Sequence, residues 1–178
     1  WGPSGWFTEA KLAGGGAVAD MGIHAIDTLR FVLGEPKALA VSARTARRFI
    51  SGDVEDTASI RIDWEGGTWS EVEAGWWQPY ADGPESSLRL YGEGGTATLF
   101  PTAVVQGAET DKEQTLPGPV VTKADHCDPS IYAAQIAHMV AVINGAPSLL
   151  DECGPAAVAI MEAAYRSAAS GKTEAVPS

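Results

Sequence analysis

The stretch "GGGAVADMGIHAID", residues 14–27, decides between two folds. Its small residues follow the pattern Gly-x-Gly-x-x-Ala, a loose copy of the loop that holds the pyrophosphate of a dinucleotide. Its polar residues Asp20, His24 and Asp27 instead stand at helical spacing. A dinucleotide loop must follow a β-strand and open a helix, because the strand aims the loop and the helix N-terminus holds the phosphates.

The residues around this stretch favour a plain helix. The segment "WGPSGWFTEAKLA", residues 1–13, contains Pro3 and Gly5 and no alternation of polar and apolar residues, so it does not form the required strand. Apolar residues recur at helical spacing from Val18 to Val32, and the glycine and proline of "LGEP" follow as stop signals. We therefore predict a helix of about five turns rather than a dinucleotide-binding loop.

Alternating runs after this helix predict an antiparallel sheet. In "ASIRIDW" apolar and polar side chains alternate, as expected of a strand with one buried face. The pair Gly66-Gly67 and the run from Gly92 to Gly95 each separate two alternating segments at hairpin distance. The segment 101–125 is expected to hold further short strands and loops.

Two further helices are predicted near the end of the chain. Asp128 and Pro129 are typical of an N-cap and a first helical residue, and Gly145 follows the apolar run that they open. The last helix opens at Asp151 and ends before Gly171.

This order of a helix, a group of strands and two helices predicts an α+β fold. We expect a predominantly antiparallel sheet with helices packed on one face, within a single domain over residues 1–178. The other face would leave Trp69 or Trp77 partly exposed, and large apolar patches usually mark interfaces. A homo-oligomer formed through the open sheet face is therefore expected.

The composition argues against several classes of protein. The net charge is −11 and the basic residues form no run beyond the group at 44–48, which argues against binding of nucleic acid. No apolar run reaches the roughly 20 residues of a membrane span, so we expect a cytoplasmic protein. Cys127 and Cys153 form no metal-binding pattern, and the group His126 to Asp128 has no second cluster to complete a metal site.

Asp20, His24 and Asp27 lie on the polar face of the predicted first helix. Asp20 precedes His24 by four residues, so its carboxylate can sit beside the imidazole, favour the protonated ring and orient it. A histidine held in this way suits general acid–base catalysis near neutral pH. The solvated face of any surface helix explains the same pattern, and the residues alone leave both interpretations open.

The same stretch carries a resemblance to a known family. "GGGAVADMGIHAIDTLRFVLGEP" resembles the segment that opens the C-terminal domain of the glucose–fructose oxidoreductase and inositol dehydrogenase family, where a glycine-rich start precedes Asp-x-x-x-His and then Asp. "SSLRLYGEGGTATL" is similar to a hairpin of that family, and residues 131–172 are similar to its closing pair of helices. The resemblance covers nearly the whole chain and is most specific in the first motif.

The resemblance implies an NAD(P)-dependent oxidoreductase that acts on a sugar, cyclitol or related polyol. In that family an N-terminal Rossmann domain binds NAD or NADP, and a C-terminal α+β domain supplies much of the substrate pocket and the subunit interface. This chain matches only the second part and opens on Trp1, so we expect a fragment of a longer protein that is inactive alone. By position, His24 corresponds to the family's acid/base and Asp20 to its partner. The family's Glu-Lys-Pro lysine has no counterpart here.

Aromatic residues are candidates to line the substrate pocket, because sugars bind against aromatic faces. We name Trp6, Trp76 and Tyr80 for this role. Trp76 and Trp77 would point to opposite sides of a strand, so at most one of them lines a pocket. An aromatic residue in the core or in a subunit contact explains each of them equally well.

Two other functions stay open from the sequence. Some relatives use the dinucleotide transiently while they cleave a glycosidic bond, and net conversion of the nicotinamide separates a dehydrogenase from them. If the chain exists alone, it is instead a non-catalytic binding or assembly domain.

Overall fold

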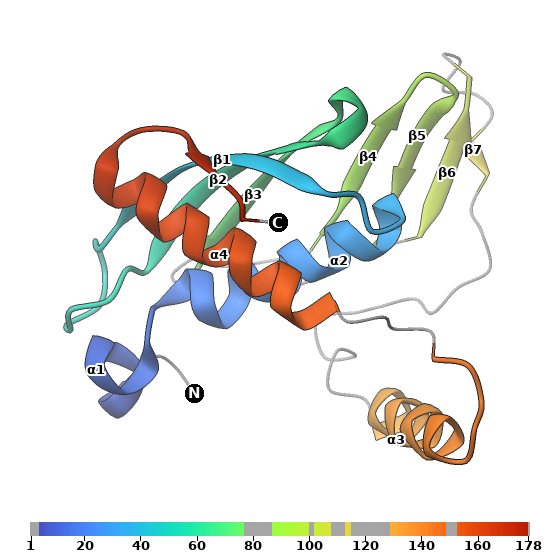
Figure 1. Ribbon diagram of the computed structural model, residues 1–178, viewed down its shortest axis with the longest axis horizontal. Helices are drawn as coiled ribbons and strands as arrows, with labels where there is room; N and C mark the ends of the chain where they lie inside the picture. Colours follow the sequence, from blue (N-terminus) through green and yellow to red (C-terminus); the bar gives the residue numbers. More distant parts are fainter. Residues whose placement is uncertain are drawn as a thin grey trace. The chain divides into compact units, whose positions relative to one another are not determined.

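The computed structural model describes residues 4–76, 87–99, 102–107, 113–114, 129–148 and 153–177. The chain forms two compact units, one built from Trp1–Gln78 with Leu150–Ser178 and the other from Pro79–Leu149 (Figure 1). Each unit contains a four-stranded antiparallel sheet, which confirms the predicted α+β class. The expectation of a single domain over the whole chain stays a prediction. No helix among these residues is long and apolar enough to cross a membrane.

The sheet of the first unit has the strand order β3-β2-β1-β8. The strands are β1 (Ala38–Ala46), β2 (Thr57–Trp64), β3 (Trp69–Gly75) and β8 (Glu174–Ala175). The predicted hairpin between β2 and β3 is confirmed, and Gly66 and Gly67 adopt the positive φ angles of 78° and 86° that its turn requires. Strand β8 pairs with Ala40 and Val41 of β1, and the sequence pattern did not predict it.

One face of this sheet carries the core. The apolar residues of β2 are buried on this face, and the helices α2 (Ile23–Leu33) and α4 (Cys153–Ser170) lie over it (Figure 1). The fully buried side chains include Val41, Ile60 and Ile62 of the sheet, together with Ile26 of α2 and Ile160 of α4. Helices packed on one face of the sheet were therefore predicted correctly.

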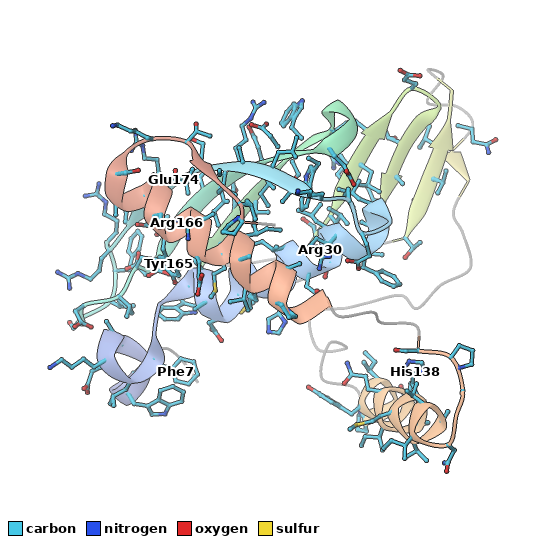
Figure 2. All side chains as sticks on the ribbon, viewed as in Figure 1. Phe7, Arg30, His138, Tyr165, Arg166 and Glu174 are labelled. Carbon is cyan, nitrogen blue, oxygen red and sulfur yellow. The ribbon has the colours of Figure 1, made fainter. Side chains whose placement is uncertain are left out.

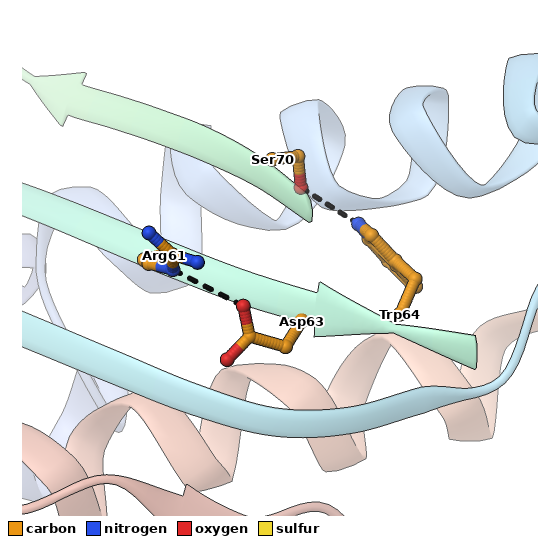
Figure 3. A network of polar contacts seen from close by, with 4 residues as sticks. All are labelled: Arg61, Asp63, Trp64 and Ser70. Carbon is orange, nitrogen blue, oxygen red and sulfur yellow. Dashed lines mark hydrogen bonds and ion pairs between the residues drawn. The ribbon is translucent and has the colours of Figure 1, made fainter. Parts of the chain in front are cut away.

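The opposite face of the sheet is open and largely polar. Trp69 is 55% exposed, as expected, but the guanidinium of Arg61 lies 4.9 Å from the centre of its ring. Arg61 also donates to Asp63 at 3.1 Å, whereas the indole of buried Trp64 donates to Ser70 at 2.9 Å (Figure 3). The expected apolar patch is thus replaced by charged residues around one tryptophan, and Trp77 lies outside the described residues.

The first helix differs from the regular five-turn helix that the spacing predicts. It begins with a π-helical turn, η2 (Val18–Gly22), in which the amide of Ile23 donates to the carbonyl of Val18, and continues as α2. It ends at Gly34, whose φ of 80° is left-handed, so the predicted stop signal is confirmed. Two short helices, η1 (Gly5–Thr8) and α1 (Ala10–Ala13), precede it.

The second unit holds the other sheet, with the strand order β4-β5-β6-β7. Its strands are β4 (Arg89–Gly92), β5 (Gly95–Thr98), β6 (Ala103–Gln106) and β7 (Glu113–Gln114), and its helix is α3 (Pro129–Ile143). The second predicted hairpin joins β4 to β5, and a side chain at Gly95 would clash with the carbonyl of Val105. Gly145 follows α3 with a φ of 94°, as its position after the apolar run predicts.

Ser167 of α4 connects the helix to the sheet through a buried hydroxyl. Strand β8 pairs only with Ala40 and Val41 of β1. The amide of Ala43, further along β1, donates instead to Ser167 Oγ at 2.9 Å. The hydroxyl in turn donates to the carbonyl of Lys172 at 2.6 Å, in the turn that leads to β8. One buried side chain therefore satisfies an edge amide and a turn carbonyl that would otherwise lack partners.

We predict that Ser167→Ala destabilises the protein by about 1–3 kcal/mol, because it leaves a buried donor and a buried acceptor unpaired. Ser170→Ala is the matched control on the same helix. Its hydroxyl bonds to Glu174 and to the Lys172 amide are both exposed to water, so their loss should cost less than about 0.5 kcal/mol. Urea unfolding of the 178-residue chain measures both. Equal unfolding free energies for the two variants would contradict this role of Ser167.

Candidate active site

The glycine-rich start of the first helix is occupied by a side chain of the protein itself. The amide of Gly16 donates to both carboxylate oxygens of Glu55 at 3.0 Å, and the amide of Val18 donates to Oε1 at 2.9 Å. The amide of Ala17 donates to the backbone carbonyl of Glu55 at 3.0 Å. The first amides of a helix have no acceptors within the helix, and here the carboxylate and carbonyl of Glu55 are their acceptors.

Two of the glycines are required for this close approach. A Cβ atom on Gly16 would clash with the carbonyl of Glu55, and one on Gly15 would clash with the hydroxyl of Tyr165. Tyr165 projects from α4 (Figure 2). Its hydroxyl donates to Glu55 Oε1 at 2.9 Å. Burial and then the adjacent carboxylate raise the pKa of the Tyr165 phenol, so it remains a protonated donor.

This arrangement does not fit the pyrophosphate of a dinucleotide. The amides that would bind phosphate oxygens already bind a carboxylate, and a phosphate brought to the same place would repel it. The glycine pattern at 14–19 therefore serves a contact within the chain. The structural context supports the choice of a helix over a dinucleotide loop.

Asp20 lies half-buried on the π-helical turn. Its carboxylate oxygen Oδ2 accepts a hydrogen bond of 2.8 Å from the indole Nε1 of Trp76, at the end of β3. Its amide donates to the carbonyl of Gly16 at 3.0 Å. The structure thus brings together two predicted site residues, with Trp76 as the hydrogen-bond donor that orients Asp20.

His24 is exposed on the first turn of α2. Its backbone carbonyl accepts from the hydroxyl of Thr28 at 2.8 Å. Among the described residues, no hydrogen bond joins the imidazole to Asp20. A π-helical turn holds more residues than an α-helical turn, so Asp20 is rotated from the position that regular i, i+4 spacing predicts. The pairing of the two side chains stays a prediction.

The other predicted site residues are not gathered here. Trp6 is 55% exposed on η1 and contacts Phe7, with the ring centres 4.2 Å apart. Tyr80 lies outside the described residues, as does the group 126–128 that was weighed as a metal site. Within the described part of the chain, no three residues of the types that bind metals are placed to hold an ion.

The sequence analysis missed the neighbouring carboxylates Glu55 and Asp56. Asp56 is fully buried and accepts hydrogen bonds from the amides of Arg48, Phe49 and Ile50 at 2.7–3.1 Å, and from the Thr57 hydroxyl at 2.8 Å. Burial alone would raise the pKa of Asp56, but these donors outweigh it and lower the pKa. The available signal was a pair of acidic residues directly before an alternating strand.

The comparison with known proteins identifies similar sequences and folds. A family model, the GFO/IDH/MocA C-terminal domain, matches residues 1–98. The chain is 33% identical over 112 residues to a protein of Amycolatopsis mediterranei named as a putative UDP-kanosamine synthase oxidoreductase subunit. This match covers 53% of this chain and 31% of the relative. The chain is also 27% identical over 177 residues to the 1,5-anhydro-D-fructose reductase of Ensifer adhaerens. This second match covers 94% of this chain and 50% of the relative.

Solved structures confirm the fold. GenD2 from gentamicin A biosynthesis, crystallised in complex with NAD, has a TM-score of 0.74 and 28% identity, over 99% of this chain and 53% of the other. The chain therefore spans about half or less of the length of the proteins that it matches. Since the family model covers 98 of the 178 residues, the chain belongs to the GFO/IDH/MocA family and matches its C-terminal domain.

Proposed function

We propose that this chain is the substrate-binding and oligomerisation domain of an NAD(P)-dependent oxidoreductase that oxidises or reduces a sugar, cyclitol or related polyol. The similarity to 1,5-anhydro-D-fructose reductase and to NAD-bound GenD2 supports this reaction class. The observation that carries the proposal is the exposed His24, one turn beyond a carboxylate that the indole of Trp76 holds in place. We place the whole protein in the cytoplasm, in keeping with the two unpatterned cysteines of this chain.

His24 is the group that moves the proton. Oxidation of a secondary alcohol removes a hydride, which a bound nicotinamide accepts, and a proton from the hydroxyl. The neutral imidazole of His24 takes this proton, and in the reverse direction the imidazolium returns it. Asp20 lies one turn before His24, and the hydrogen bond from Trp76 keeps its carboxylate in one orientation.

The dinucleotide is held outside the glycine-rich segment. The amides of Gly16 and Val18 are engaged by Glu55, so they do not bind the phosphates. We assign the cofactor to another part of a longer protein, in keeping with relatives about twice the length of this chain.

The open face of the first sheet is the proposed subunit interface. Its exposed residues are complementary in charge across the strands, with Arg44 and Arg61 on β1 and β2 and Glu71 and Glu73 on β3. A two-fold axis along the strands would place the acidic strand of one copy over the basic strands of the other. Trp69, 55% exposed on this face, supplies apolar area within the charged rows.

We expect the 178-residue chain by itself to bind neither NAD nor NADP and to be inactive, because Glu55 already binds the amides of the glycine-rich segment that loosely matches a phosphate-binding loop. Titration calorimetry with each cofactor measures this. Saturable binding with a Kd of about 1–100 μM, a range that calorimetry detects easily, would show that the chain holds a dinucleotide site.

In the full-length enzyme, His24→Ala should lower kcat by roughly 10²- to 10⁴-fold and leave the affinity for the dinucleotide nearly unchanged, since general acid–base catalysis contributes that much. Asp27→Asn is the control, because Asp27 is exposed on the same helix and should have little effect. Steady-state kinetics at saturating substrate measure both variants. A folded His24→Ala enzyme with the wild-type kcat would remove His24 from the reaction.

We expect the chain to self-associate through the open sheet face and Arg61→Glu to weaken that association, because it reverses the central basic charge of the face. Arg47→Glu, in the exposed segment after β1, is the matched control for a change of charge elsewhere. Light scattering at about 10–50 μM, where stable assemblies persist, measures the mass of each. A monomeric wild-type chain would argue against the interface.

A further inference from the structure

The dipeptide Glu55-Asp56 lies between the two segments that hold Asp20. On one side, the carboxylate and carbonyl of Glu55 bind the amides of residues 16–18 at the helix start. On the other side, the carbonyl of Asp56 accepts the backbone amide of Trp76 at 3.1 Å. The helix start and the end of β3 are therefore both anchored to the same two residues.

These contacts close a ring of hydrogen bonds around Asp20. Trp76 donates through its indole to the Asp20 carboxylate at 2.8 Å, and the Asp20 amide donates to the carbonyl of Gly16 at 3.0 Å. From Gly16 the ring returns to Glu55 through two bonds of 3.0 Å, and the peptide bond between Glu55 and Asp56 completes it. The helix start and the end of β3, which both hydrogen-bond to Asp20, are thus connected to Glu55.

Glu55 and Asp56 each accept further hydrogen bonds from other parts of the chain. Tyr165 of α4 donates to Glu55 Oε1, and the buried carboxylate of Asp56 is bound by three consecutive amides and the hydroxyl of Thr57. A side chain bound on several sides has few alternative rotamers, so it transmits its position to the groups that it binds. Asp20, by contrast, is only half-buried and has Trp76 as its side-chain partner.

We propose that Glu55 is a positioning residue, which sets the orientation of Asp20 through the glycine-rich helix start and through Trp76. This proposal rests on the proposed function, in which Asp20 supports the acid–base role of His24. The carboxylate is required because its two oxygens accept from Gly16, Val18 and Tyr165 together. An amide at this position offers one oxygen and turns an N–H₂ group toward these donors.

The indole N–H signal of Trp76 in the ¹H–¹⁵N spectrum of the 178-residue chain reports on this ring without any catalytic assay. Trp76→Phe assigns the signal, and Asp20→Ala gives its position when the hydrogen bond is absent. We expect Glu55→Gln to move the signal toward that of Asp20→Ala and to speed exchange of the Val18 amide. Glu9→Gln, an exposed carboxylate directly before α1 in the same unit, should change neither.

A second variant keeps the test decisive if Glu55→Gln does not fold. Tyr165→Phe removes one donor to Glu55 and retains the aromatic ring, so it should move the Trp76 signal in the same direction by a smaller amount. A wild-type Trp76 signal in folded Glu55→Gln, or in Tyr165→Phe where only that variant folds, would overturn the proposal. A role limited to stability predicts that result.

Kinetics of the full-length enzyme separate this proposal from the proposed function. Glu55→Gln should lower kcat by about 10-fold or more with a smaller change in KM, because small displacements of catalytic groups slow the chemical step more than they weaken binding. If His24→Ala retains the wild-type kcat, the proposed function fails, and the Trp76 signal still decides whether Glu55 orients Asp20. If His24→Ala is inactive and the Trp76 signal does not respond, the positioning role alone fails.

Discussion

The contact between the Glu55 carboxylate and the glycine-rich helix start is the interaction on which the first unit depends. It joins three elements that are far apart in the chain: the π-helical turn, the segment before β2 and helix α4. The absence of side chains at Gly15 and Gly16 allows the approach, because a Cβ atom at either position would clash. The free amides of the helix start supply the attraction, since they carry the positive end of the helix dipole.

The sequence predicts those parts of the fold that local patterns determine. The alternation in β2, the turn at Gly66 and Gly67 and the helix end at Gly34 all follow from residues close to one another in the chain. Strand β8 was missed because it has two residues, too few for a pattern, and forms only by pairing with β1. The π-helical turn was missed because hydrophobic spacing does not distinguish it from an α-helix.

The same distinction applies to the candidate site. Spacing within one helix pointed to Asp20 and His24, and a preference of sugars for aromatic faces pointed to Trp76. The contact between Trp76 and Asp20 spans 56 positions, and that between Tyr165 and Glu55 spans 110, so neither follows from a local pattern. The predicted pairing of Asp20 with His24 assumed a regular helix, and the π-helical turn changes the geometry on which that assumption was based.

The glycine motif shows why a short sequence pattern is ambiguous about its ligand. Glycines followed by a helix start create a place where an anion binds, and the amides do not distinguish a phosphate from a carboxylate. A carboxylate of the same chain has the advantage of a high effective concentration once the fold forms, so it excludes a dissolved anion of similar intrinsic affinity. The residue that resolves the ambiguity is therefore an acidic side chain elsewhere in the chain, here Glu55, 39 positions after Gly16.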